Sequence, residues 1–145
     1  MRLAVPAGPV RIGFGVATRK MPIRSTAWMP PTILLVDDNE ALRTLASKLL
    51  QEQGFRVITA GDGEEALEIF QQQPHAISLL LTDIMMPKMN GLDLADRLRQ
   101  LRPELPVLFI SGNPEPGSRT LGYLAKPFTK TQLMSRVRQA LETPG

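Results

Sequence analysis

Two apolar runs of strand length constrain the fold of this chain more than any other feature. Residues 32–36 read Thr-Ile-Leu-Leu-Val and residues 79–82 read Leu-Leu-Leu-Thr, so both runs are apolar at successive positions. A strand with one face in water alternates apolar and polar residues, whereas a strand that is apolar on both faces is typical of a parallel sheet covered by helices on each side. Carboxylates end both runs: Asp37 and Asp38 follow the first, and Asp83 ends the second.

Segments with apolar residues at helical spacing separate the strands. Four helices are predicted, at residues 40–53, 64–72 and 91–102 and from Thr129 onward. Three further strands are predicted, at residues 55–60, 106–110 and 121–125. Strands that alternate with helices form βαβ units with right-handed crossovers, so the order of elements predicts an α/β fold with a parallel sheet.

Composition and charge are those of a globular protein. The chain is 43% hydrophobic and 21% charged and has no cysteine, which excludes disulfides and thiolate metal sites. The sequence contains no apolar run long enough to span a membrane. The formal charge of +3 is unevenly distributed, because residues 1–31 hold five basic residues and no acid, which leaves 12 bases and 14 acids in residues 32–145. At −2, the body gives no indication of a basic face for nucleic acid.

Residues 1–31 form a basic leader rich in Pro, Gly and Arg, without sustained periodicity. Three interpretations stay open, of which a flexible tail is the favoured one. In the second interpretation, the first residue of the chain is assigned too early, since Met21 or Met29 would each begin a sensible protein. The third is a targeting or binding arm, which the acid-free composition permits, although no apolar segment is followed by a small-residue cleavage site.

Polar side chains stand where the predicted strands end. Asp37 and Asp38 follow the first strand, Asp83 ends the third, Ser111 follows the fourth and Lys126 follows the fifth. The carboxyl ends of parallel strands lie on one rim of the sheet, which is where open α/β sheets bind ligands. We therefore expect three carboxylates, a hydroxyl and an amine to converge there.

This set of groups favours a particular chemistry. Three adjacent carboxylates stay ionised only if a positive charge joins them, and oxygen ligands without His or Cys suit a hard cation, most plausibly Mg²⁺. Lys126 adds a movable positive charge, and Ser111 adds a hydrogen bond. We interpret the arrangement as a site for an anion that comes and goes at Asp83, with phosphoryl the obvious candidate.

Four segments, in order, then match one protein family. They are residues 35–39 (Leu-Val-Asp-Asp-Asn), 81–91 (Leu-Thr-Asp-Ile-Met-Met-Pro-Lys-Met-Asn-Gly), 110–112 (Ile-Ser-Gly) and 123–128 (Tyr-Leu-Ala-Lys-Pro-Phe). With these segments, residues 32–143 resemble the receiver domain of two-component response regulators. The resemblance covers nearly the whole chain after the leader.

The resemblance implies roles for the acidic residues. Asp83 would accept a phosphoryl group from a phosphohistidine on a partner kinase. Asp38, Asp83 and the backbone carbonyl of Met85 would ligate Mg²⁺, and Asp37 would hold the ion through water.

It also implies roles for the remaining groups. Ser111 and Lys126 would grip the phosphoryl oxygens, and Tyr123 matches the aromatic residue that turns inward when the hydroxyl residue shifts. The peptide bond between Lys126 and Pro127 is usually cis in this family. His75, the sole histidine, is expected on the surface and not at the site.

The chain departs from the family between Ser111 and Lys126. A receiver usually has a full fourth helix there, but Pro114, Pro116 and Gly117 forbid more than about one helical turn. The fourth helix is therefore expected to be reduced or absent, so how the 112–122 segment would transmit a signal stays open. Shortened segments of this kind resemble receivers attached to hybrid histidine kinases.

Together these features predict a flavodoxin-like, doubly wound, five-stranded parallel sheet of order 2-1-3-4-5, with the leader at 1–31 and the receiver domain at 32–143. The predicted function is a cytoplasmic Mg²⁺-dependent phosphoacceptor in a phosphorelay, which catalyses its own phosphorylation and slow dephosphorylation and is not otherwise an enzyme. Its expected partners are a histidine kinase or phosphotransfer protein and an unidentified output protein, with no nucleic acid or membrane. The alternatives are a phosphorylation-independent docking module and a detached receiver of a hybrid kinase.

Overall fold

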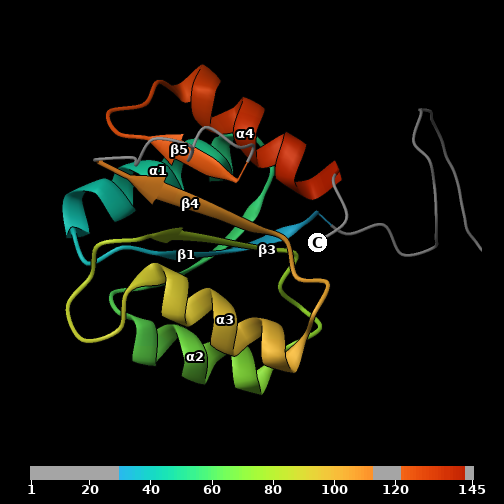
Figure 1. Cartoon of the computed structure of the whole chain (residues 1–145). Helices are drawn as coiled ribbons and strands as arrows, with labels where there is room; N and C mark the ends of the chain where they lie inside the picture. Colours follow the sequence, from blue (N-terminus) through green and yellow to red (C-terminus); the bar gives the residue numbers. More distant parts are fainter. Residues whose placement is uncertain (1–29, 113–121, 143–145) are drawn as a thin grey trace, which may run out of the picture.

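The computed structural model describes residues 30–112 and 122–142 (Figure 1). Five strands and four helices follow one another in this part of the chain. Their bounds are β1 (Thr32–Val36), α1 (Glu40–Glu52), β2 (Arg56–Ala60), α2 (Gly63–Gln72), β3 (Leu79–Asp83), α3 (Gly91–Leu101), β4 (Val107–Ser111), β5 (Tyr123–Ala125) and α4 (Lys130–Glu142).

The strands form one parallel sheet of order β2-β1-β3-β4-β5, which confirms the predicted topology. β1 lies at the interior of the sheet, with Val36 opposite Ala60 of β2 on one side and Thr82 of β3 on the other. Asp83 lies opposite Ile110 of β4. Because all strands run the same way, their carboxyl ends share one rim.

Helices cover both faces of the sheet, with α1 and α4 on one side and α2 and α3 on the other (Figure 1). β1 contributes to both cores: Ile33 and Leu35 pack with residues of α1 and α4, whereas Leu34 and Val36 pack with residues of α2 and α3. This two-sided burial explains why residues 32–36 are apolar at every position.

Short polar side chains start the helices above this rim. Asn39, Asp62 and Asn90 are the N-caps of α1, α2 and α3, and each side chain accepts a hydrogen bond from the backbone N–H three residues later. Such caps satisfy a backbone donor that the first helical turn leaves free. They fix where each helix begins, and so they fix the loops that carry the polar residues of the rim.

Some expectations lie outside the described residues. The reduced fourth helix concerns residues 112–122, of which 113–121 are not described, and the start of the fifth strand at 121 falls there too. The basic leader, apart from its last two residues, is also outside. In the part of the chain that the structure describes, no helix is both long and apolar enough to cross a membrane.

Candidate functional site

The rim of the sheet brings the predicted polar residues together. Asp83 is the last residue of β3, Ser111 is the last residue of β4, and Asp37 and Lys126 directly follow β1 and β5. Main-chain hydrogen bonds continue the sheet across this rim, since the Asp37 N–H donates to the Ala60 carbonyl at 3.2 Å and the Lys126 N–H donates to the Ser111 carbonyl at 2.9 Å. The backbone therefore sets the spacing of these side chains.

Three carboxylates lie close to one another at this rim. Asp37, Asp38 and Asp83 each place one oxygen within 4.8 Å of the others. Asp37 is 1% exposed and Asp83 is 5% exposed, whereas Asp38 is exposed to solvent. The cluster therefore has two buried members and one open side.

Lys126 supplies the nearby positive charge. Its Nζ lies 3.3 Å from Oδ2 of Asp83 and 3.6 Å from Oδ2 of Asp37. The peptide bond between Lys126 and Pro127 is cis, as the family resemblance implied. One amine thus pairs with two of the three clustered carboxylates, and the four groups together carry more negative than positive charge.

The carboxyl of Asp37 is buried beside these charges. Burial raises the pKa of its carboxyl; the hydrogen bond from the Asn39 N–H and the charge of Lys126 oppose the rise, and the charges of Asp83 and Asp38 add to it. Its Oδ1 accepts the Asn39 N–H at 2.9 Å, while its buried Oδ2 has no hydrogen-bond partner in residues 30–112 and 122–142. A buried carboxylate oxygen without a donor, beside two more carboxylates, fits a bound cation.

The backbone around Asp83 is tightly folded. Its Oδ1 accepts the Met85 N–H at 3.2 Å, and its main-chain carbonyl lies against the start of α3. A Cβ atom added at Gly91 would lie 2.2 Å from the Asp83 carbonyl oxygen, so only glycine fits there. The Gly91 N–H donates to the Ile84 carbonyl at 2.9 Å, which closes the loop between β3 and α3.

Ser111 and Tyr123 lie on β4 and β5. Ser111 is 5% exposed and lies next to Ile110, which pairs with Asp83. Tyr123 is half-buried and pairs with Phe109, and the two rings are 5.4 Å apart at 36°. Ser111 is therefore a near neighbour of the acidic cluster along the sheet, and Tyr123 lies two positions back toward the other rim.

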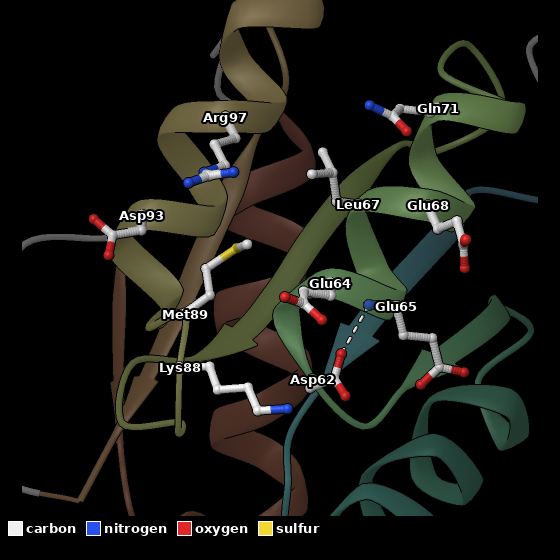
Figure 2. A pocket seen from close by; sticks show the side chains of 10 residues that line it. All are labelled: Asp62, Glu64, Glu65, Leu67, Glu68, Gln71, Lys88, Met89, Asp93 and Arg97. Carbon is white, nitrogen blue, oxygen red and sulfur yellow. Dashed lines mark hydrogen bonds between the residues drawn. The ribbon is translucent and has the colours of Figure 1, made fainter.

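Two hollows flank this part of the molecule. One, of about 640 Å³, lies at the site and is lined by Asn39, Ala41, Leu42, Leu45, Gly112, Lys126, Pro127 and Phe128. The other, of about 680 Å³, lies between α2 and α3, and Figure 2 shows side chains of the two helices facing each other across it, with Met89 between them. It contains none of the residues predicted for the site. His75 is exposed on the loop before β3, as predicted.

One contact at the site is not among the sequence-based predictions. Nη1 of Arg43, on α1, donates to the main-chain carbonyl of Asp37 at 2.6 Å. Its position four residues after the N-cap Asn39 was a usable signal, because a long side chain in the first turn can reach back to the strand before the helix.

The sequence pattern of the response regulator receiver domain matches residues 33–138. The chain belongs to this family. The match includes β1 to β5 and most of α4, so it includes every residue of the site.

The chain is similar in sequence to proteins of two kinds, transcriptional regulators and a sensor kinase. The transcriptional regulatory protein CpxR of Escherichia coli (strain K12) is 42% identical over 116 residues, which is 75% of this chain and 48% of CpxR. The sensor kinase CckA of Brucella abortus (strain 2308) is 36% identical over 118 residues, which is 77% of this chain and 12% of CckA. The chain thus spans about half the length of the regulators that it matches, and much less of the kinase.

Solved structures agree with the fold. The receiver domain from the hybrid histidine kinase CckA has a TM-score of 0.67 and 39% identity, covering 76% of this chain and 98% of that one. A response regulator receiver domain protein from Clostridium thermocellum has a TM-score of 0.71 and 28% identity, covering 77% of this chain and 94% of that one.

Proposed function

We propose that this receiver domain is a phosphoacceptor that takes a phosphoryl group onto Asp83 in a Mg²⁺-dependent reaction. One observation carries the proposal: a nearly buried carboxylate at the end of a central strand lies between a lysine amine and two further carboxylates. A carboxylate in such a place is positioned as a nucleophile toward a phosphorus atom, with cations to neutralise the phosphoryl oxygens.

The acidic residues of the site would bind the metal ion. Asp38, Asp83 and the Met85 carbonyl would hold Mg²⁺, with Asp37 acting through water. The Oδ2 of Asp37, which accepts no hydrogen bond from the described residues, supports this use. The ion would supply electrostatic stabilisation of the negative charge on the phosphoryl oxygens. Cations of this kind favour oxygen ligands, and the cluster offers them without any nitrogen or sulfur.

The reaction is a transfer between two groups. An oxygen of Asp83 attacks the phosphorus of a phosphohistidine, the new P–O bond forms as the P–N bond breaks, and the imidazole leaves with the electron pair and then takes a proton. Lys126, now bridging Asp83 and Asp37, would turn its amine to a phosphoryl oxygen, and Ser111 would hold another. Attack by water on the same phosphorus later regenerates the Asp83 carboxylate, so the domain catalyses its own phosphorylation and dephosphorylation.

The phosphodonor would be a histidine kinase or a phosphotransfer protein in the cytoplasm. The hollow beside Lys126 supports docking of such a protein, because it is lined by apolar residues at the edge of the site and Leu45 at its wall is 52% exposed. The signal would pass on through contacts with another protein. Tyr123 would take part in the conformational change that follows phosphorylation.

A second candidate has support of its own. The chain could act as the detached receiver of a hybrid histidine kinase, since the CckA receiver is 39% identical over almost its full length. In that case, the phosphoryl group on Asp83 would pass on to a phosphotransfer protein, and the chemistry at the site would be the same. A phosphorylation-independent docking module is the remaining alternative.

The test is direct. The protein is incubated with acetyl phosphate and Mg²⁺, and the intact mass is measured with and without a chelator. We expect the wild-type mass to rise by one phosphoryl group only when Mg²⁺ is present, and Asp83→Asn to show no gain. A wild type that fails to respond, or a variant that responds equally, would leave the docking module as the better account.

A further inference from the structure

One arginine is placed to control the geometry of the acidic cluster without being a member of it. Arg43 belongs to the first turns of α1, where its own N–H donates to the Asn39 carbonyl at 2.9 Å. Its half-buried side chain turns back toward the end of β1, and Nη1 donates to the main-chain carbonyl of Asp37 at 2.6 Å. A hydrogen bond from a charged donor to a carbonyl is among the stronger ones in proteins.

The carbonyl that Arg43 holds belongs to the peptide that carries Asp38. A peptide unit is planar, so fixing the Asp37 carbonyl oxygen also fixes the direction in which the Cα of Asp38 leaves that plane. Asp38 needs such a constraint, because its side chain is exposed and accepts no hydrogen bond within the described part of the chain. Its place in the cluster therefore depends on its backbone.

The side chain of Arg43 also lies next to the turn between β2 and α2. A Cβ atom added at Gly61 would lie 3.4 Å from Nη1 of Arg43 and 3.8 Å from Oε1 of Glu65. Glu65 is in turn fixed, since its Oε1 accepts the Gly61 N–H at 2.8 Å. The guanidinium group thus lies next to the β2–α2 turn, and its hydrogen bond to the Asp37 carbonyl ties it to the end of β1.

We propose that Arg43 is a positioning residue for metal binding, and that it acts by holding the Asp37–Asp38 peptide so that Asp38 points into the acidic cluster. The inference rests on the proposed function, because it concerns the Mg²⁺ that Asp38 and Asp83 would hold. Residues that orient metal ligands commonly change metal affinity about 10- to 100-fold when they are removed.

Charge and positioning make opposite predictions here. A cation near three carboxylates repels a second cation, so removing the charge of Arg43 alone would tighten Mg²⁺ binding. Removing a hydrogen bond that positions Asp38 would weaken it. The direction of the change in affinity therefore distinguishes the two roles.

The experiment measures Mg²⁺ affinity by titration calorimetry for the full chain and three variants. Arg43→Met removes both charge and hydrogen bond, and Arg43→Lys keeps the charge on a shorter side chain without the planar fork. Arg102→Met is the matched control, because Arg102 also donates its guanidinium hydrogens to main-chain carbonyls, those of Pro74 and Ile77, away from the acidic cluster.

We expect Arg43→Met to bind Mg²⁺ about tenfold more weakly, Arg43→Lys to be intermediate, and Arg102→Met to match the wild type even if it melts earlier. In phosphorylation from acetyl phosphate, the two Arg43 variants should need a higher Mg²⁺ concentration for half of the maximal rate. Their rate at saturating Mg²⁺ should be nearly unchanged. If Arg43→Met does not fold, Arg43→Lys decides in the same way.

Unchanged or tighter Mg²⁺ binding by a folded Arg43 variant would overturn the inference while leaving the proposed function intact. A wild-type chain that binds no Mg²⁺ would refute the proposed function itself, and the inference would fall with it.

Discussion

Asp37 carries a charge that the folded, metal-free protein disfavours. Burial raises the pKa of its carboxyl, so the folded state binds this proton more tightly than the unfolded state does. The stability that this group contributes is therefore complete below its ordinary pKa of 3.8 and is lost as pH rises through the raised pKa. At neutral pH, the ionised Asp37 destabilises the fold unless a cation joins it.

The substitution Asp37→Asn tests this directly. Without Mg²⁺, the variant should unfold at higher urea concentration than the wild type at neutral pH, with a gain on the order of 1 kcal/mol. The difference should shrink as pH falls through the raised pKa of Asp37 and be lost below its ordinary pKa of 3.8. The amide keeps an oxygen for the Asn39 N–H and removes the buried charge. Saturating Mg²⁺ should stabilise the wild type more than the variant, and a variant that is less stable than the wild type in the absence of metal would contradict this account.

The charge of Lys126 lowers the pKa of Asp37 and so opposes the effect of burial. Lys126 provides the amine within 3.6 Å of both Asp37 and Asp83, so Lys126→Met should raise the pKa of Asp37 further and weaken the grip on a phosphoryl oxygen. We expect the rate of phosphorylation from acetyl phosphate to fall at least about tenfold, while Mg²⁺ affinity is kept or improved because a competing cation is gone. Lys130→Met, on an exposed position of α4, is the control and should behave as the wild type.

At the scale of elements, the start of α3 is pressed against the end of β3. A Cβ atom at Gly91 would lie 2.2 Å from the Asp83 carbonyl oxygen and 3.0 Å from the Cα of Ile84, both of them main-chain atoms. Gly91→Ala must therefore shift the backbone that presents Asp83, at an expected cost of about 3 kcal/mol in the free energy of unfolding.

Thermal unfolding measures this cost, and Gly112→Ala is the matched control. Among the described residues, the nearest atom to a Cβ added at Gly112 is Cδ of Lys126, at an ordinary contact distance of 3.9 Å. We expect Gly112→Ala to melt near the wild-type temperature and Gly91→Ala well below it. Equal melting temperatures would show that the β3–α3 loop accommodates a side chain and is not as tightly fixed as described.

The elements themselves could largely be predicted because local signals agree with tertiary packing. The apolar run at 32–36 matches β1, and the helices predicted at 40–53 and 64–72 match α1 and α2 to within one residue at each start. β4 ends at Ser111, one residue later than predicted, because pairing with β5 continues through that residue. Such end effects depend on the neighbouring strand and leave no mark in the local sequence.

At the scale of the molecule, charge is distributed unevenly along the sequence. Residues 1–31 carry five of the 17 Lys and Arg residues and none of the 14 acids. Among the described residues, the carbonyl of Pro31 accepts the Arg56 N–H at 3.0 Å, and the family match begins at residue 33. Deleting residues 1–29 should therefore leave the melting temperature and the Mg²⁺-dependent phosphorylation within error of the full chain.

Circular dichroism melting and intact-mass measurements on both chains check this expectation. Loss of phosphorylation, or a large drop in melting temperature, would show that the leader is part of the functional domain and would move the domain boundary from residue 32 toward the amino terminus.

The convergence of the site could be predicted from topology, whereas its internal electrostatics could not. Parallel strands place Asp37, Asp83 and Lys126 on one rim whatever their rotamers are. That Asp37 is buried while the adjacent Asp38 is exposed depends on how the loops above the rim fold. The position of Arg43 in the first turn of α1 indicates that its side chain can reach back toward β1, but its partner, the main-chain carbonyl of Asp37, depends on how the loop folds.

The central claim is that the phosphoryl group goes to Asp83 and not to either neighbouring carboxylate. In the most direct measurement, the chain is first phosphorylated with acetyl phosphate in the presence of Mg²⁺. It is then treated with borohydride, which reduces an aspartyl phosphate to homoserine, and the modified position is located by peptide mass spectrometry. The account predicts homoserine at position 83 alone, and none in a sample prepared without Mg²⁺. Reduction at position 37 or 38, or none in a sample whose intact mass shows phosphorylation, would contradict it.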